Sequence, residues 1–281
     1  MLTASQVAEF NRNGCLVAPQ PVISDSEVEE LRGELDRVLA RAAKGFAPEE
    51  AQPVLVSKWS ETPESILWQV VNIWEASTAF RRLLHLPFVV KAISQLTGQP
   101  DLMIWHDQIQ YKPPFHGGIN NWHQDAPLWP ILRPETPVTA WIALDEVDES
   151  NGCMWMVPGS HKWGNHIDLL MKSPESEFLN LNWTPPGDAE INTFKKIPWP
   201  VKKGHVSFHH SMTWHGSHKN KSDRPRRAIA IHFMTGQARF VASGQHVMKR
   251  FVELPDGAPM SQAGAHFPVV CKDGEPVRMP G

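Results

Sequence analysis

Several stretches within the first hundred residues carry apolar side chains at every third or fourth position, which is the spacing of amphipathic helices. Ser24 and Glu27 are placed as a capping box, which predicts the start of a helix that ends near Gly45. Residues 46–67 contain three prolines and predict an irregular connection. The remaining expected elements are helices at 4–13, 80–84 and 87–96 and a strand at 68–74.

After Pro100 the pattern changes to short β-like runs that are separated by proline and glycine. About eight such runs favour a jelly-roll sandwich with the helices packed outside it. The segment 162–196 has no clear periodicity, and an insertion of this kind is typical of a binding loop or lid. The expected strands lie near 102–112, 120–125, 138–147, 153–157, 197–202, 205–210, 213–218 and 227–235.

The length of 281 residues and the lack of an evident linker predict a single domain over residues 1–281. Its parts are expected to be a mostly helical segment 1–100, a jelly-roll core 101–236 that carries the insertion, and a tail 237–281. We expect the insertion and the tail to close a substrate pocket, because such loops vary freely on a shared scaffold.

Charge and cysteine usage exclude several classes of protein. A net charge of −3 argues against nucleic acid as the main partner, because phosphate binding needs concentrated positive charge. No apolar run approaches the roughly 20 residues that span a bilayer. The three cysteines show no CxxC spacing and predict free thiols in a reducing compartment. Since the start of the chain lacks a signal pattern, we expect a cytoplasmic protein; the oligomeric state is not indicated.

Two His-x-Asp triplets supply candidate metal ligands: His123 with Asp125, and His166 with Asp168. Side chains two residues apart in a strand share a face, so the first pair would point the same way. A carboxylate and two histidines form a facial site that suits non-haem Fe(II). Because the first triplet follows an alternating run and the second lies in the irregular insertion, we prefer the first.

The third ligand is ambiguous from spacing alone. A histidine on a β face is more often a hydrogen-bonded core or rim residue than a ligand, and several histidines gather in one short stretch. The candidates are His205, His209, His210, His215 and His218.

Six separated motifs follow one another between residues 100 and 235: Trp122–Asp125, Thr139–Leu144, Asn151–Cys153, Val157–His161, Trp214–Ser217 and Arg226–Phe233. In this order they resemble the phytanoyl-CoA dioxygenase family of Fe(II)- and 2-oxoglutarate-dependent oxygenases. The resemblance implies a mainly β protein with flanking helices, built on a cupin-like double-stranded β-helix. It also implies Fe(II), 2-oxoglutarate and O2 as cofactor and cosubstrates, and release of succinate and CO2.

By position, the resemblance implies that His123, Asp125 and His215 are the iron ligands. It implies that Arg226 binds the distal carboxylate of 2-oxoglutarate, because a guanidinium pairs with a carboxylate through two parallel hydrogen bonds. Arg227, the next residue of the strand, should face the opposite side. The resemblance further assigns Ser217, Gln110 and Trp141 to the cosubstrate and Trp129, Trp122 and His106 to the substrate.

Asp125 favours hydroxylation over halogenation, because family members that halogenate lack the metal-binding carboxylate. Two alternatives stay open from the sequence. One is a jelly-roll that binds a metal or ligand without turnover, and the other is a cupin-type dioxygenase or isomerase that does not use 2-oxoglutarate. We expect a small organic substrate and favour a secondary metabolite over a CoA thioester, since no basic patch is evident for CoA phosphates.

Overall fold

The computed structural model describes residues 1–60, 65–172 and 195–279. Its α-helices are α1 (Ala4–Asn13), α2 (Asp25–Lys44), α3 (Thr78–Leu84), α4 (Pro87–Thr97) and α5 (Ile167–Lys172). Its short 3-10 helices are η1 (Ile73–Glu75), η2 (Ala126–Leu128), η3 (Ser160–Lys162), η6 (Val247–Phe251) and η7 (Met260–Gln262). Its strands are β1 (Cys15–Val17), β2 (Leu55–Ser60), β3 (Ile66–Val71), β4 (Leu102–Lys112), β5 (Asn120–His123), β6 (Leu132–Arg133), β7 (Val138–Ala143), β8 (Met154–Met156), β9 (Ile197–Trp199), β10 (Val206–His210), β11 (His215–Ser217), β12 (Arg226–Thr235), β13 (Arg239–Phe240), β14 (Val269–Lys272) and β15 (Glu275–Pro276).

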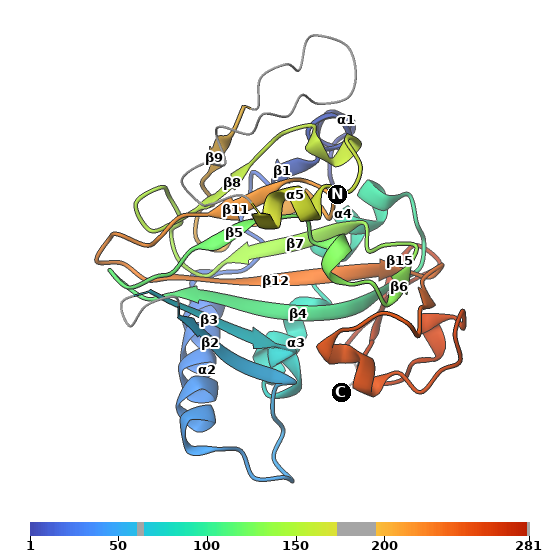
Figure 1. Ribbon diagram of the computed structural model, residues 1–281, viewed down its shortest axis with the longest axis horizontal. Coiled ribbons are helices and arrows are strands. Elements are labelled where there is room, and N and C mark those ends of the chain that lie inside the picture. Colours follow the sequence, from blue (N-terminus) through green and yellow to red (C-terminus); the bar gives the residue numbers. More distant parts are fainter. Residues whose placement is uncertain (61–64, 173–194, 280–281) are drawn as a thin grey trace.

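These strands form a large and a smaller antiparallel sheet, with helices α2 and α3 on one side of the large sheet (Figure 1). In the large sheet the order is β1-β10-β7-β12-β4. The outer edge of β4 pairs with β3 along its C-terminal half and with β14 at its start. The smaller sheet has the order β5-β11-β8-β9. The expected jelly-roll with helices outside it, a double-stranded β-helix, is confirmed.

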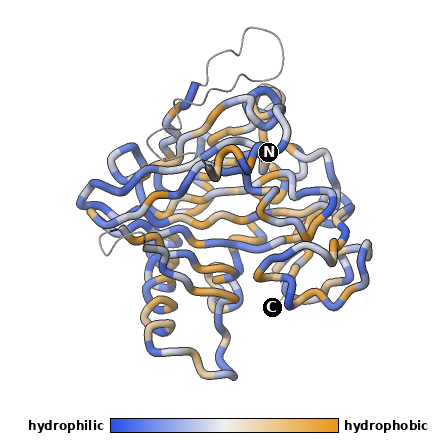
Figure 2. Tube along the Cα trace, viewed as in Figure 1, coloured by the Kyte–Doolittle hydropathy of each residue, from blue (hydrophilic) through white to orange (hydrophobic). Residues whose placement is uncertain are grey.

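Strand β12 shows how the large sheet divides the molecule into two cores. Its residues Ile229 and Ile231 belong to the cluster that also contains the buried faces of α2, α3 and α4. Its residues Ala228 and Ala230 belong to a second cluster that contains residues of the smaller sheet. Since side chains alternate along a strand, the second face is available for a site between the sheets. Figure 2 shows hydrophobic and hydrophilic residues alternating along the strands of this sheet.

The predicted helices of the first hundred residues are confirmed. Both Thr3 and Ser24 form capping boxes, in which the hydroxyl accepts from the third residue of the helix and that residue's side chain accepts from the cap. Pro87 occupies the first turn of α4, where its missing N–H costs no hydrogen bond.

The prediction of an irregular connection over residues 46–67 is wrong in its second half. Strand β2 lies there and pairs along its whole length with β3, so the two form a ribbon at the edge of the large sheet. The strand expected at 68–74 begins earlier, at Ile66, and ends at Val71. It cannot continue because Asn72 adopts a left-handed conformation, and Asp107 then accepts the backbone N–H of Ile73.

The insertion and the tail are only partly irregular. The insertion contains α5, and its residues 173–194 lie outside the described part of the chain. The tail adds the strands β13, β14 and β15, which the sequence pattern did not predict. The three cysteines, Cys15, Cys153 and Cys271, are free thiols, as predicted. Among the described helices, none is both long enough and apolar enough to cross a bilayer.

Candidate metal centre

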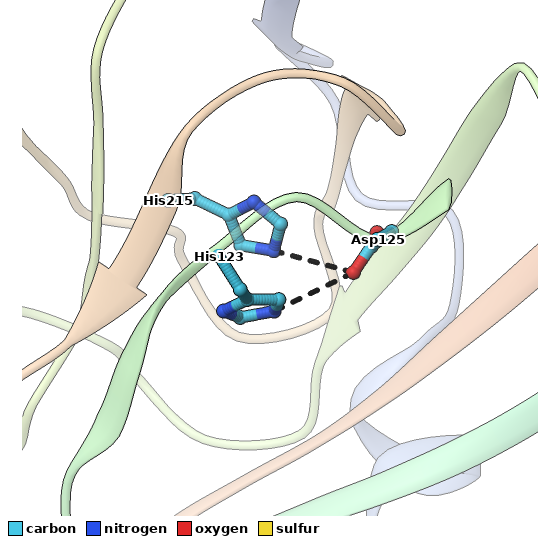
Figure 3. Close-up of side chains that lie close together, drawn as sticks. All are labelled: His123, Asp125 and His215. Atoms are coloured by element: carbon cyan, nitrogen blue, oxygen red, sulfur yellow. Dashed lines mark ion pairs between the residues drawn. The ribbon is translucent and has the colours of Figure 1, made fainter. Parts of the chain in front are cut away.

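Three side chains converge between the two sheets: His123, Asp125 and His215 (Figure 3). Their candidate ligand atoms all lie within 4.8 Å of one another. The Nε2 atoms of both histidines are 3.5 Å from Oδ1 of Asp125. His123 is the last residue of β5 and His215 is the first residue of β11, and the two are register partners in the smaller sheet.

Asp125 reaches this position for a reason that differs from the predicted one. Strand β5 ends at His123, and Asp125 has helical backbone angles of φ −68° and ψ −53°. The rule that residues two apart share a face of a strand therefore does not apply. Instead, the backbone N–H of Asp125 donates to the carbonyl of Ser211 at 2.7 Å, which holds the turn beside β10.

Both imidazoles present the same nitrogen to the centre. Nδ1 of His123 lies 2.6 Å from the carbonyl of Asn121, and Nδ1 of His215 lies 2.8 Å from the carbonyl of Thr213. Because a carbonyl can only accept, Nδ1 carries the proton in each ring, and Nε2 keeps its lone pair. Burial, reinforced by His123, lowers the pKa of His215 well below its ordinary value, so this ring stays neutral and able to bind a metal.

The second carboxylate oxygen of Asp125, Oδ2, contacts two further side chains. The hydroxyl of Thr139 donates to Oδ2 at 3.0 Å, and Nε2 of His209 lies 3.1 Å from the same atom. Burial alone would raise the pKa of Asp125, but hydrogen bonding with neighbouring histidines, including His209, holds that pKa well below its usual range. The result is an ionised carboxylate whose Oδ1 faces two imidazole nitrogens, which is a facial donor set of the kind that binds non-haem Fe(II).

The centre opens into a cavity of about 480 Å³, whose wall includes His123 and Asp125. Three exposed apolar side chains, Trp59, Leu128 and Met171, also line it. Among the described lining residues there is no lysine or arginine. The polar part of the wall consists largely of side-chain amides, from Gln69, Gln108, Gln110, Asn120 and Asn121.

Arg226 is the first residue of β12 and is fully buried; it is not among the residues that line this cavity. Its Nε donates to the carbonyl of Gly152 at 3.2 Å, and its Nη2 donates to Oγ of Ser217 at 3.2 Å. Its Nη1 is buried and has no hydrogen-bond partner among the described residues. Burial lowers the pKa of Arg226 to about 10, which still leaves the guanidinium charged at neutral pH. Trp141 packs beneath it, with the guanidinium carbon 5.3 Å from the ring centre.

The adjacent arginine faces the other way, as predicted from strand alternation. The side chain of Arg227 pairs with Asp145 through two contacts of 2.9 and 3.0 Å, on the side of the sheet away from Arg226. A third arginine nearby, Arg224, is partly exposed and pairs with Asp148 at 2.6 Å. Arg226 is therefore the one of the three whose guanidinium keeps a free, buried donor.

The three residues assigned to substrate occupy different places. Trp129 lines the cavity. His106 lies one layer behind it, with its ring 5.3 Å from that of Trp129, and is not among the lining residues. Trp122 packs in the apolar cluster with Trp163 and Trp214, because it precedes His123 in β5 and so faces the opposite side of the strand. This placement does not support a substrate contact for Trp122.

Sequence reasoning missed three residues of the centre, Thr139, His232 and His246, and offered His209 only as a candidate third ligand. His232 and His246 line the cavity, and Nδ1 of His232 contacts the Thr139 hydroxyl at 2.8 Å. Strand alternation could have found His232, since it lies six residues after Arg226 on the same face of β12. His246 carried no such signal, because it comes from the tail.

The other His-x-Asp triplet does not form a metal site in the described structure. His166 lies just before α5 and contacts the carbonyl of Trp163, and Asp168 lies in the first turn of that helix. The preference for the first triplet is confirmed, since the group that could hold a metal in the described residues is the one around Asp125.

Comparison with known proteins is consistent with this geometry. The sequence model of the phytanoyl-CoA dioxygenase (PhyH) family matches residues 10–228. The peroxisomal phytanoyl-CoA dioxygenase of Bos taurus is 25% identical over 272 residues, covering 90% of this chain and 76% of that relative.

Two solved structures share the fold across nearly the whole chain. The non-haem alpha ketoglutarate dependent carbocyclase SnoK from nogalamycin biosynthesis is 25% identical with a TM-score of 0.72, covering 95% of this chain and 96% of SnoK. The epimerase SnoN, in complex with Fe3+, alpha ketoglutarate and nogalamycin RO, is 23% identical with a TM-score of 0.68. That alignment covers 94% of this chain and 97% of SnoN.

Proposed function

Because this chain belongs to the phytanoyl-CoA dioxygenase family of iron- and 2-oxoglutarate-dependent oxygenases, we propose that it hydroxylates a small, uncharged organic molecule. The chain is a 2-oxoglutarate-dependent non-haem iron dioxygenase by family. The proposal adds the type of oxidation, the residues that carry it and the chemical class of substrate.

One observation supports this proposal above the others: His123, Asp125 and His215 present two imidazole Nε2 atoms and one carboxylate oxygen at a cavity. These donors fit Fe(II), because two imidazole nitrogens and one carboxylate oxygen are the donor set that non-haem Fe(II) sites use. Arg226 fits the distal carboxylate of 2-oxoglutarate, since its buried Nη1 has no partner among the described residues and an anion would satisfy it.

The spacing of the anchor and the metal ligands also fits 2-oxoglutarate. His215 and Ser217 are two residues apart in β11, which corresponds to about 7 Å along a strand. A five-carbon diacid can therefore lie along β11, with one end at the iron ligands and the other at Ser217 and Arg226. Gln110, on β4 of the large sheet, lines the cavity and is the candidate to orient the cosubstrate.

The roles of the side chains follow from these contacts. When bound, Fe(II) and 2-oxoglutarate supply the oxidising chemistry, in which O2 is consumed and succinate and CO2 are released. Thr139 and His209 hold the Asp125 carboxylate, and the carbonyls of Asn121 and Thr213 fix the two imidazole rings. The apolar side chains at the cavity keep water from the reacting groups.

The cavity wall supports an uncharged substrate. Its described residues offer amides that can donate and accept hydrogen bonds, but no cation that would pair with phosphates. Trp59 and Trp129 offer flat apolar surfaces, so a ring-containing molecule with hydroxyl or carbonyl groups suits both parts of the wall. A secondary metabolite of this kind fits better than a CoA thioester.

Anaerobic titration tests the reaction class. Addition of Fe(II) and 2-oxoglutarate should give a visible charge-transfer band, and admission of O2 should remove it. A protein that shows no band would instead be a binding module or a cupin-type enzyme.

A substrate panel tests the substrate class. Uncharged ring compounds should stimulate succinate release, and stimulation by CoA thioesters alone would contradict the proposed substrate class.

A further inference from the structure

Lys112, at the end of β4, is a second buried cation beside the proposed cosubstrate anchor. Its side chain is fully buried, as is that of Arg226. The two are direct register partners in the adjacent strands β4 and β12, which run side by side through the large sheet (Figure 1). Placing two cations in one buried position is costly unless an anion or good acceptors are close.

Ser217 lies between the two cations and contacts both of them. Nζ of Lys112 donates to Oγ of Ser217 at 2.7 Å, and Nη2 of Arg226 donates to the same oxygen at 3.2 Å. Lysine and arginine can only donate, so both bonds use acceptor capacity of the hydroxyl. The hydroxyl proton of Ser217 is then left to donate to a third group, and a carboxylate is the acceptor that a site with these charges favours.

We propose that Lys112 is a positioning residue of the 2-oxoglutarate pocket, which orients the Ser217 hydroxyl toward the distal carboxylate and adds a second positive charge behind it. This inference rests on the proposed function. It makes Lys112 responsible for selecting a diacid over a 2-oxo acid that ends in a methyl group.

A purely structural role for Lys112 makes a different prediction. Nζ also lies 3.3 Å from the carbonyl of Ser217 and bonds the carbonyl of His218, so it ties the end of β4 to the end of β11. If linking the two strands were its whole role, removing the amine would lower the stability of the protein and weaken the binding of every 2-oxo acid equally. The two roles are therefore separated by comparing two ligands that differ at the distal end.

The test compares 2-oxoglutarate with 2-oxopentanoate, which keeps the metal-chelating 2-oxo acid and lacks the distal carboxylate. Dissociation constants are measured anaerobically on the Fe(II)-loaded protein. For Lys112→Met we expect 2-oxoglutarate to bind about 10- to 100-fold more weakly, the value of one charge-assisted hydrogen bond. Binding of 2-oxopentanoate should change by less than about twofold. Lys44→Met, an exposed lysine at the end of α2, is the matched control and should change neither constant.

A double-mutant cycle with Ser217→Ala shows whether Lys112 acts through the hydroxyl. In the Ser217→Ala background, Lys112→Met should cause a smaller loss of 2-oxoglutarate affinity than in the wild type, because the shared contact is already gone. If Lys112→Met does not fold, Lys112→Arg keeps the charge and should retain the preference for the diacid.

Several results would overturn the inference. Equal losses for both acids, full additivity with Ser217→Ala, or an unchanged 2-oxoglutarate constant in Lys112→Met each contradict a role in diacid selection, as does loss of the preference in Lys112→Arg. Failure of the wild-type protein to bind Fe(II) and 2-oxoglutarate together would instead defeat the proposed function on which the inference stands.

Discussion

At the scale of single residues, the centre depends on atoms that do not face the metal position. The Asp125 carboxylate uses Oδ1 toward the two histidines and Oδ2 toward Thr139 and His209. The backbone carbonyls that accept from Nδ1 decide which nitrogen each ring presents. Such supporting contacts set the orientation of metal ligands and contribute strongly to metal affinity.

Replacing Thr139 by valine tests one supporting contact without changing the shape of the side chain. The variant loses the hydroxyl that donates to Oδ2 of Asp125, so the carboxylate is held less firmly. We expect the Fe(II) dissociation constant, measured by anaerobic titration, to increase about 10-fold or more.

Thr136→Val is the matched control for that substitution. The Thr136 hydroxyl is also buried, but it has no hydrogen-bond partner among the described residues. Its removal should leave the Fe(II) constant unchanged. Equal Fe(II) affinity in the Thr139→Val and wild-type proteins would show that the contact does not support the metal ligand.

At the scale of elements, alternation along β12 separates two adjacent arginines by function. Arg226 faces the interior between the sheets and keeps a free donor, whereas Arg227 pairs with Asp145 on the other face.

Arg226→Met should weaken 2-oxoglutarate binding about 100-fold, because a bidentate charge-assisted contact is lost. Arg227→Met should lower the midpoint of urea unfolding and leave the 2-oxoglutarate constant unchanged. A stronger effect on 2-oxoglutarate binding from Arg227→Met would reverse the assignment.

The same alternation explains how much of the fold was predictable. The strand expected at 102–112 has those bounds in the structure, and the one expected at 227–235 begins one residue earlier. These strands contain long alternating runs, so the local pattern is sufficient. Strand β14 pairs with the start of β4, far away in the sequence, and its short run carries no signal of that partner.

The candidate site was predictable only in part from local pattern. The spacing of His123 and Asp125 predicted this pair of ligands because residues two apart in a strand share a face. That rule does not apply, because the backbone turns at Asp125. Five histidines were equal candidates for the third ligand, and the order of the family motifs singled out His215, which the geometry then placed beside the other two. The contacts of Thr139 and Lys112 depend on which strands become neighbours, and sequence spacing does not contain that information.

At the scale of the whole molecule, the cavity is assembled from segments that are far apart in the chain. The edge ribbon supplies Trp59 and Gln69, the turn after β5 supplies Leu128, α5 contributes Met171, and the tail contributes His246. The expectation that the insertion and the tail contribute to the pocket is supported by the last two. Because the loops and edges determine this wall, relatives with the same core can differ in substrate.

The folded molecule also keeps several histidines out of water, which makes its stability depend on pH. Burial lowers the pKa of His210, His232 and His246 to about 4 in each case. In the unfolded chain these groups titrate near pH 6.5, so the unfolded state binds more protons between about pH 6.5 and 4. Stability should therefore be highest above this window and fall as the pH decreases through it.

We expect the free energy of unfolding to decrease by about 2 kcal/mol or more between pH 7 and pH 5, measured by urea titration of the metal-free protein. His210 is the one of these three histidines that does not line the cavity, so His210→Asn should make this dependence shallower without altering the cavity wall. Stability that stays constant or rises on acidification would contradict the burial of these histidines as neutral rings.

The central claim is that His123, Asp125 and His215 hold the iron that couples 2-oxoglutarate oxidation to substrate oxidation. The most direct measurement is the formation of succinate from 2-oxoglutarate in air by the Fe(II)-loaded protein, in the wild type, Asp125→Ala and His166→Ala. We expect succinate from the wild type and from His166→Ala, and none above background from Asp125→Ala. Full succinate formation by Asp125→Ala, or its loss in His166→Ala alone, would show that Asp125 is not an iron ligand.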